Sequence, residues 1–449
     1  MKRETGSLIL FFSKMVLLVT VLAVFYFGHR FFYEQTLPYY FWGYVLILLL
    51  YTTSLYVVNK IYNGFNFGNV TLQEIIISWV LCLVFVNGFQ YFILSLLVLE
   101  LIPIYGMAII LGVQITLAIP LAMLINKIYF IFNPAHKAVI IYGNAEKLDE
   151  YCSIVTMQRN KFRVDHVVSQ DAETGRILDV IDRSESVFFL NMDEKKQDWL
   201  FEYCYLHNKH AYILPTFSSI LINTASTLWL SNTPVFSLKN PEPDMSTKIF
   251  KRVIDIVLSL LGIIITGFIM IGIWLAVRLY DNHPAIYKQI RVTKGGRLFT
   301  LYKFRSMRPN AEDDGVPRLA AMDDDRITPF GRFIRKTRLD ELPQLFNVLS
   351  GSMSLVGPRP ERPEIARQYE EMYPNFAFRT KVKAGITGFA QIYGRYNTSP
   401  EEKLFLDIMY IETFSILEDV KLLLQTLKVI FQGSSTEGIE GDSTTAMWK

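Results

Sequence analysis

The sequence predicts a membrane protein that joins a helical membrane part to soluble α/β parts. Hydrophobic residues make up 51% of the chain and charged residues only 19%, a balance typical of membrane proteins. Four apolar spans occupy the first third, and each approaches the ~20 residues that cross a bilayer. Beyond them, short apolar runs alternate with polar segments. At 449 residues the chain is too long for one typical domain, so we expect two or three.

The four apolar spans predict a four-helix transmembrane bundle over residues 1–127. The first span is not a cleavable signal peptide, because it is long, contains Lys14 and lacks a clear small-residue cleavage site. The spans contain almost no ionisable residues, which favours an anchoring or assembly role over transport. They cover about residues 7–28, 39–58, 75–99 and 102–125.

The cations that flank the bundle predict its orientation. Positive residues concentrate in cytoplasmic loops, so both ends of the bundle and its middle loop are expected in the cytoplasm. Arg30 is the exception on the outer side. The orienting cations are Lys2, Arg3, Lys60, Lys127 and Lys137.

Residues 138–240 predict a soluble α/β domain. Buried-strand patterns occur at 139–143, 187–190 and 211–214, with helical stretches between them. The first strand ends at Gly143, but the following residues lack the glycines of a G-x-G-x-x-G fingerprint. We therefore expect no dinucleotide site here. A proline-containing linker follows at 240–243.

A third region begins near residue 248 with an apolar run that ends at about Val277. Its length permits spanning, and Asp255 within it needs a partner, for which Arg252 or another nearby cation is the obvious candidate. Residues 290–299 predict a hairpin with a glycine turn. Apolar residues at helical spacing predict helices over 401–431, in the membrane interface or in the core.

An adjacent carboxylate pair, Asp340 and Glu341, lies at a predicted helix start. Asp340 suits the N-cap, Glu341 the first turn, and Pro343 is tolerated there. A helix N-terminus favours carboxylates and phosphates. The apolar residues that follow at helical spacing predict a buried face. They are Leu342, Leu345, Phe346 and Leu349.

Arginines near this pair in sequence indicate an anionic phosphate substrate. Guanidinium groups bind phosphate through paired hydrogen bonds. The candidates are Arg335, Arg338 and Arg359. A capped helix with solvated charges is the alternative for an isolated Asp-Glu pair, but here the pair belongs to a longer series of motifs.

Residues 248–436 carry five motifs in one order. With them, the chain resembles the bacterial sugar transferases, monotopic phosphoglycosyl transferases that move a sugar-1-phosphate onto polyprenol phosphate. The motifs are 251–255 (KRVID), 302–308 (YKFRSMR), 339–349 (LDELPQLFNVL), 354–360 (SLVGPRP) and 385–395 (GITGFAQIYGR).

The resemblance implies a fold and a location. It assigns 248–436 to a monotopic catalytic domain whose apolar segment, about 250–279, is a re-entrant helix with both ends on one membrane face. The family usually breaks this helix at Ser-Pro, whereas this chain has Thr266-Gly267-Phe268, and glycine breaks helices less strongly, by about 1 against about 3 kcal/mol. Residues 138–240 resemble the Rossmann-like domain of larger members. The catalytic domain is expected on the cytoplasmic face of the bacterial plasma (inner) membrane, and the tail at 437–449 is expected to be flexible.

The resemblance also implies a mechanism. Asp340 attacks the sugar-bearing phosphate of a UDP-sugar and releases UMP, and undecaprenyl (polyprenol) phosphate then takes the phospho-sugar to give polyprenyl diphosphate-sugar. This is the first membrane step of exopolysaccharide, capsule or O-antigen synthesis. Glu341 either helps bind Mg²⁺ or assists the second half-reaction, and Asp340 and Glu341 are the expected metal ligands. Lys303 and Arg305 join the three arginines as phosphate-binding candidates, although each could instead be a surface cation.

The expected partners are a UDP-sugar of the glucose or galactose type, polyprenol phosphate and membrane lipid, with a homodimer as one option. The net charge of +3 gives no reason to expect nucleic acid. Scattered cysteines and histidines favour neither disulfides nor zinc. Two alternatives stay open: a glycosyltransferase that transfers sugar alone and releases UDP, and a non-enzymatic membrane scaffold with the α/β domain as sensor.

Overall fold

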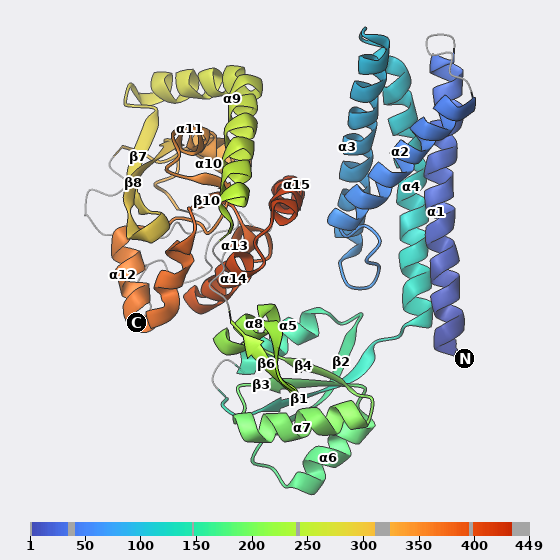
Figure 1. Cartoon of the computed structure of the whole chain (residues 1–449), viewed down its shortest axis with the longest axis vertical. Helices are drawn as coiled ribbons and strands as arrows, with labels where there is room; N and C mark the ends of the chain where they lie inside the picture. Colours follow the sequence, from blue (N-terminus) through green and yellow to red (C-terminus); the bar gives the residue numbers. More distant parts are fainter. Residues whose placement is uncertain are drawn as a thin grey trace. The chain divides into compact units, whose positions relative to one another are not determined.

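The computed structural model describes residues 2–34, 41–145, 148–238, 243–309, 324–394 and 398–432 (Figure 1). The predicted tail at 437–449 lies outside them. Two compact units make up the chain, Met1–Leu214 and Pro215–Lys449. Each is described by itself.

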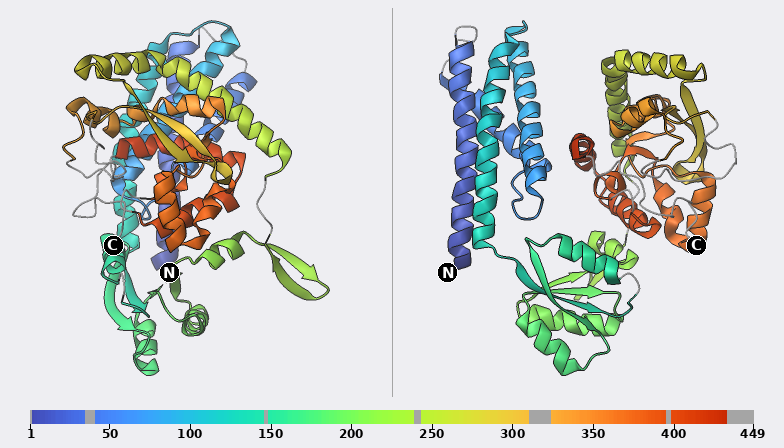
Figure 2. Two further views of the ribbon diagram at one scale, coloured as in Figure 1. Left: turned by 90° about the vertical axis from the view of Figure 1, so that its left-hand side faces the viewer. Right: turned by 180° about the vertical axis from the view of Figure 1, so that it is seen from behind.

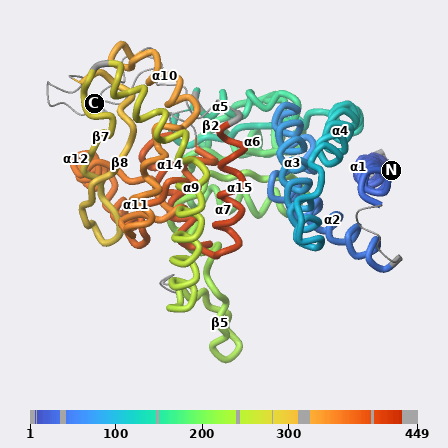
Figure 3. Tube along the Cα trace, turned by 90° about the horizontal axis from the view of Figure 1, so that it is seen from above, coloured from blue at the N-terminus to red at the C-terminus, as the bar shows by residue number. Residues whose placement is uncertain are grey.

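Four long helices open the first unit. Helix α4 packs along α1 and α3, whereas α2 runs across the direction of view in Figure 3. Its interior contains large apolar side chains, together with a hydrogen-bonded polar group. The Gln114 amide donates to the Tyr51 hydroxyl (2.9 Å), and Asn87 donates to Gln114 Oε1 (2.8 Å), while Asn87 Oδ1 is buried without a hydrogen-bond partner among the described residues. The helices are α1 (Lys2–Tyr33), α2 (Phe41–Ile61), α3 (Leu72–Val98) and α4 (Ile104–Phe132).

Among the described residues, five helices are long and apolar enough to cross a membrane. Four are those of the first unit, and the fifth is α9 (Met245–Asp281) in the second. The predicted class, a membrane protein with α/β parts, is confirmed. By length and composition alone, α9 meets the same criteria as the other four.

A four-stranded parallel sheet with the order β2-β1-β3-β4 completes the first unit. The three predicted strands are confirmed as β1 (His136–Tyr142), β3 (Ser186–Leu190) and β4 (His210–Ile213). The edge strand β2 (Phe162–Ser169) was not predicted, because most of its residues are exposed or half-buried and give no apolar run.

Helices cover both faces of this sheet (Figure 2). Helix α5 (Leu148–Met157) packs on the face that carries Ala138 and Ile140. The opposite face, with Val139 and Ile141, packs against two further helices. These are α6 (Thr174–Arg183) and α7 (Glu194–Leu206).

The second unit begins with α8 (Phe217–Thr224). Ile220 of α8 belongs to the same apolar cluster as Leu404 and Ile408, and the Thr224 hydroxyl donates to Glu412 (3.5 Å). This helix therefore packs with the C-terminal helices of its own unit. An exposed antiparallel hairpin follows it, β5 (Ser226–Leu230) and β6 (Thr233–Ser237).

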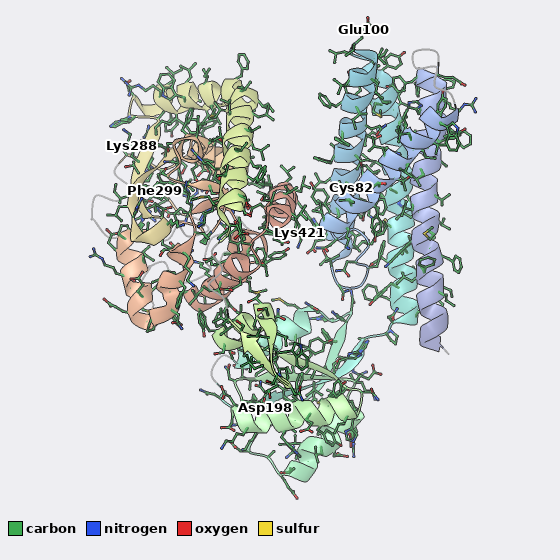
Figure 4. All side chains as sticks on the ribbon, viewed as in Figure 1. Cys82, Glu100, Asp198, Lys288, Phe299 and Lys421 are labelled. Carbon is green, nitrogen blue, oxygen red and sulfur yellow. The ribbon has the colours of Figure 1, made fainter. Side chains whose placement is uncertain are left out.

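The predicted glycine hairpin is confirmed as β7 (Ile286–Val292) and β8 (Leu298–Phe304), on which Figure 4 labels Lys288 and Phe299. Gly295 (φ 68°) and Gly296 (φ 73°) make the left-handed turn between the strands. Two short parallel strands, β9 (Ser354–Val356) and β10 (Gly385–Thr387), lie deeper in the unit. The helices around them are α10 (Pro329–Lys336), α11 (Gln344–Ser350), α12 (Pro363–Met372), α13 (Phe389–Ile392), α14 (Pro400–Glu412) and α15 (Ile416–Gln432), with 3₁₀ turns at η1 (Lys294–Gly296), η2 (Leu339–Glu341) and η3 (Pro374–Lys381).

Polar contacts tie the first turns of α9 to this unit, and they correct one prediction. Asp255 is not paired with Arg252: it accepts hydrogen bonds from Ser354 Oγ (3.1 Å) and the Leu355 N–H (3.0 Å). Arg252 instead donates to the carbonyls of Val348 (2.7 Å) and Leu349 (2.8 Å). The Arg252 guanidinium thus caps the free carbonyls at the end of α11, and strand β9 supplies the partners of Asp255.

Candidate active site

The chain reaches the carboxylate pair through a left-handed residue. Arg338 has φ 58° and ψ 14°, and this turn starts η2 immediately after it. The prediction that Asp340 is an N-cap is therefore wrong. Helix α11 begins later, at Gln344, and no side chain caps either element. The Asp340 carboxylate is consequently not used to hold a helix end.

The predicted buried face of α11 is also only partly right. Phe346 is 47% exposed, whereas Asn347 is buried. Asn347 accepts the Tyr302 N–H (3.0 Å) and donates to the Thr300 carbonyl (2.7 Å). The amide thus fastens α11 to β8, the strand that carries Lys303. Asn347 is a polar residue on the inward face of the sequence LPQLFNVL, and this position could have indicated its role.

Three cations surround Glu341. Its Oε1 lies 2.7 Å from Arg359 Nη2, 3.1 Å from Lys303 Nζ and 3.8 Å from Arg338 Nη1. They come from the segment after β9, from β8 and from the turn before η2. The fold therefore joins residues far apart in sequence around one carboxylate.

This cluster fixes the charge of Glu341. Burial alone would raise the pKa of the carboxyl, but Arg359, Lys303 and Arg338 together hold that pKa well below its usual value. The Glu341 charge in turn raises the pKa of Arg359, while burial lowers the pKa of Lys303. Glu341 is therefore an ionised anchor for the cations.

Asp340 lies in a different environment. Within the described part of the chain, none of the ion pairs involves its carboxylate, and the side chain is buried. Burial, helped by the negative charge of Glu341, raises the pKa of Asp340 to about 6, against the opposing charges of Lys303 and Arg335. At neutral pH this carboxylate is mostly ionised, and among the described residues it makes no ion pair, so it can act as a nucleophile.

The other two phosphate-binding candidates, Arg335 and Arg305, are not among the three cations that pair with Glu341. Arg335, in the last turn of α10, is near enough to Asp340 to lower its pKa. Arg305 follows the end of β8, and its Nε donates to the Pro284 carbonyl (2.9 Å). The structure does not bring Arg305 to the ion pairs of Glu341.

A buried ionic network behind Arg359 escaped sequence reasoning. Arg379 donates to the Arg359 carbonyl (2.8 Å) and pairs with Asp407 (2.7 Å) and Glu361 (3.6 Å). Burial raises the pKa of Asp407 to about 6. Arg291 donates to the Pro360 carbonyl (3.0 Å). These contacts hold the Arg359 loop in place, but the partners are too scattered in sequence to form a motif.

The carboxylates of Asp340 and Glu341 are the groups in this site that can bind a metal ion. Among the described residues, no group of three metal-binding His, Cys, Asp or Glu side chains exists. Mg²⁺ usually needs only one or two carboxylates and takes its other ligands from water and substrate phosphates. Asp340 and Glu341 fit that role if the anionic substrate accompanies the ion, because three cations already face Glu341.

A buried carboxylate pair beside clustered cations, in a unit that carries a long apolar helix, has the features of a membrane enzyme for phosphate-bearing substrates. A family model described as bacterial sugar transferase matches residues 246–433. The chain is also 32% identical to an undecaprenyl-phosphate galactose phosphotransferase of Salmonella typhimurium, over 66% of this chain and 68% of that protein. The chain belongs to the bacterial sugar transferase family, which confirms the predicted family and enzyme class.

Two other relatives match over less of their length. A galactosyl transferase, CpsE, of Streptococcus agalactiae is 43% identical over 42% of this chain and 44% of its own. A UDP-glucose:undecaprenyl-phosphate glucose-1-phosphate transferase of Klebsiella pneumoniae is 39% identical over 45% and 44%. For these relatives, the chain spans less than half of the protein that it matches.

Proposed function

We propose that this enzyme transfers a sugar-1-phosphate from a UDP-sugar to polyprenol phosphate, releases UMP and forms a polyprenyl diphosphate-sugar. One observation carries the proposal: Asp340 is buried without a salt bridge beside Glu341, whose three cations can also meet phosphate oxygens. The activities by which these relatives are named support undecaprenyl phosphate as acceptor and glucose or galactose as the sugar.

In the first step, a carboxylate oxygen of Asp340 attacks the sugar-bearing phosphorus. A bond forms between that oxygen and phosphorus, the bridge to the second phosphate breaks, and UMP leaves with the electron pair. Arg338, Arg359 and Lys303 offset the negative charge on the transferring group. Glu341 keeps these cations in place.

In the second step, a phosphate oxygen of polyprenol phosphate attacks the same phosphorus. The acyl phosphate bond breaks and Asp340 recovers its carboxylate, so no proton transfer is required overall. Splitting the exchange in two lets donor and acceptor use one site in turn.

Mg²⁺ is the proposed cofactor, with Asp340 and Glu341 as the residues that would hold it. Bound there, it would offset charge on the substrate diphosphate. Glu341 therefore has two proposed tasks, as an anchor for the cations and as a metal ligand.

Contacts along α9 support a re-entrant arrangement. If straight, this helix of 37 residues would extend about 55 Å. Its first turns bond to β9, and Met270 and Ile273 pack against Phe304 and Ile334 of the same unit. Figures 1 and 2 show α9 bending between these parts. We propose that both ends lie on one face, the cytoplasmic face of the bacterial inner membrane.

Backbone-directed hydroxyls accompany the bend. Thr266 Oγ1 donates to the Gly262 carbonyl (2.7 Å) and Ser259 Oγ to the Asp255 carbonyl (2.5 Å). Such bonds bend helices. They supply a substitute for the family's proline.

Product analysis tests this function. The full-length protein is incubated with undecaprenyl phosphate, Mg²⁺ and a panel of UDP-sugars, and the released nucleotide is identified by chromatography. We expect UMP and a lipid that carries a diphosphate-sugar. Release of UDP with a monophosphate-linked sugar would identify a sugar-only glycosyltransferase, and no product with any UDP-sugar would favour a scaffold.

A further inference from the structure

A second charged pocket lies in the catalytic unit, where α9 begins. Its volume is about 510 Å³, and none of the seven candidate active-site residues lines it. The start of α9, the β7–β8 turn and the segment 380–383 form its walls. Its charged lining consists of Lys248, Lys251, Arg252, Lys294, Lys381, Lys383 and the single carboxylate Asp255.

Lys251, Arg252 and Asp255 have protein partners within the described residues. Lys251 pairs with Asp419, and Arg252 caps the carbonyl end of α11. Asp255 accepts hydrogen bonds from strand β9. The pocket therefore holds six cations and one carboxylate, and the hydrogen-bond donors of that carboxylate are neutral.

Lys294 and Lys383 add positive charge, which the Asp255 carboxylate offsets only in part at Lys383. Within the described residues, neither forms an ion pair. Lys383 Nζ and Arg252 Nη2 converge on Gly351: a Cβ there would lie 3.7 Å and 3.2 Å from them. Burial and then the charge of Arg252 lower the pKa of Lys383.

Hydrogen bonds hold this arrangement of cations in place. Thr293 Oγ1 donates to the Ser352 carbonyl (3.0 Å) and accepts the Ala384 N–H (3.2 Å). The turn that bears Lys294 is thus fixed to the segment that bears Lys383. Like charges gathered in a half-buried pocket repel one another unless an anion joins them.

We propose that this pocket binds a phosphate group, at a place separate from the Asp340–Glu341 site. Clustered lysines recognise phosphate as a point charge. The group could belong to a lipid headgroup or to a free phosphate. The exposed apolar face of α9 starts at the pocket, with Phe250 62%, Val253 51% and Val257 55% exposed, and would suit the chains of a lipid.

Lipid titration of the full-length protein tests the proposal. The protein in detergent is titrated with phosphatidic acid or with diacylglycerol, which lacks the phosphate, and bound lipid is counted by native mass spectrometry. The variant is Lys294→Ala/Lys383→Ala. The matched control is Lys195→Ala/Lys288→Ala, two exposed lysines outside the pocket.

We expect the pocket variant to bind phosphatidic acid about 30-fold more weakly than the wild type does. Its binding of diacylglycerol should equal that of the wild type. The control should match the wild type, and Lys294→Arg/Lys383→Arg should retain binding because it keeps both charges. If inorganic phosphate displaces the lipid and binds equally well alone, the phosphate site stands with a soluble ligand. Equal binding of phosphatidic acid by the wild type and the alanine variant would overturn the proposal.

Discussion

The catalytic unit and the middle α/β sheet both contain parallel strands and glycine turns, yet they use their buried space differently. In the catalytic unit, strand β8 and the turns around η2 bring three cations to one buried carboxylate. In the sheet of the first unit, the turn after β1 is filled by the chain itself. A Cβ on Gly143 would lie 2.3 Å from the Asn191 carbonyl oxygen and 2.8 Å from Met192 Cα.

This difference favours the carboxylate site over the sheet as the place of the proposed function. A nucleotide phosphate needs open space and free N–H groups at the end of the first strand. At Gly143 that space is occupied by the neighbouring turn, whereas around Asp340 unsatisfied charge is buried. We therefore expect charge-changing variants to lower turnover strongly around Asp340 and to leave it unchanged in the sheet.

The largest effect is expected for Asp340→Asn, which removes the attacking charge and nearly keeps the shape. We expect turnover to fall by about 10⁴-fold or more, because loss of a nucleophile removes the covalent route. Steady-state UMP release measures it. Asp198→Asn on α7, an exposed carboxylate labelled in Figure 4, is the matched control and should leave turnover unchanged. Near-normal turnover by Asp340→Asn would remove the contrast between the regions.

Glu341→Gln should have the next largest effect. The variant leaves Arg359, Lys303 and Arg338 without their shared anion, so we expect turnover to fall by about 10²-fold. A Mg²⁺ titration sharpens the result, because partial recovery at high Mg²⁺ identifies a metal-ligand role. Wild-type rates at every Mg²⁺ concentration would show that the anchored carboxylate is dispensable.

A pH profile distinguishes the two carboxylates. The pKa of Asp340 is raised to about 6, so the nucleophile is protonated below that value and ionised above it. We expect kcat/KM to fall about tenfold for each pH unit below about 6. Glu341, whose pKa is held well below its usual value, should not contribute in this range. A profile flat between pH 7 and about 4.5 would contradict the assignment.

The smallest effect is expected in the middle sheet. Calorimetry with NAD and the full-length protein should detect no binding in the micromolar range, because the Gly143 turn is filled. Gly143→Ala should lower the melting temperature, since its Cβ meets backbone that cannot easily move, and overpacking costs about 1–3 kcal/mol. Micromolar NAD affinity would mean that the sheet binds nucleotides after all.

Features of the structure that depend on residues close together in the chain can be predicted from the sequence, and features that depend on distant residues cannot. The β7–β8 hairpin follows from its glycines, and β1 from its apolar run, because neighbours in sequence decide both. Asn347 and the Arg379–Asp407 pair act across long separations, so no local pattern reveals them. Arg305 lies in the same motif as Lys303, but β8 ends at Phe304 and the chain turns away.

The apolar helix α9 shows the same limit. Composition gives length and hydropathy, which are equal for a crossing and a re-entrant helix. The contacts of its two ends with one unit are the observation that supports the proposed re-entrant arrangement. Likewise, the N-cap prediction for Asp340 failed because Arg338 adopts a left-handed conformation that arginine rarely takes.

Direct detection of the intermediate tests the central claim, that Asp340 is the nucleophile. The full-length enzyme is mixed with UDP-glucose or UDP-galactose and Mg²⁺ without polyprenol phosphate, quenched, digested and examined by mass spectrometry. The account predicts a hexose-phosphate adduct on the peptide that contains Asp340, present in Glu341→Gln if the first step survives and absent in Asp340→Asn. An active enzyme that shows no adduct, with kinetics that require both substrates bound together, would contradict it.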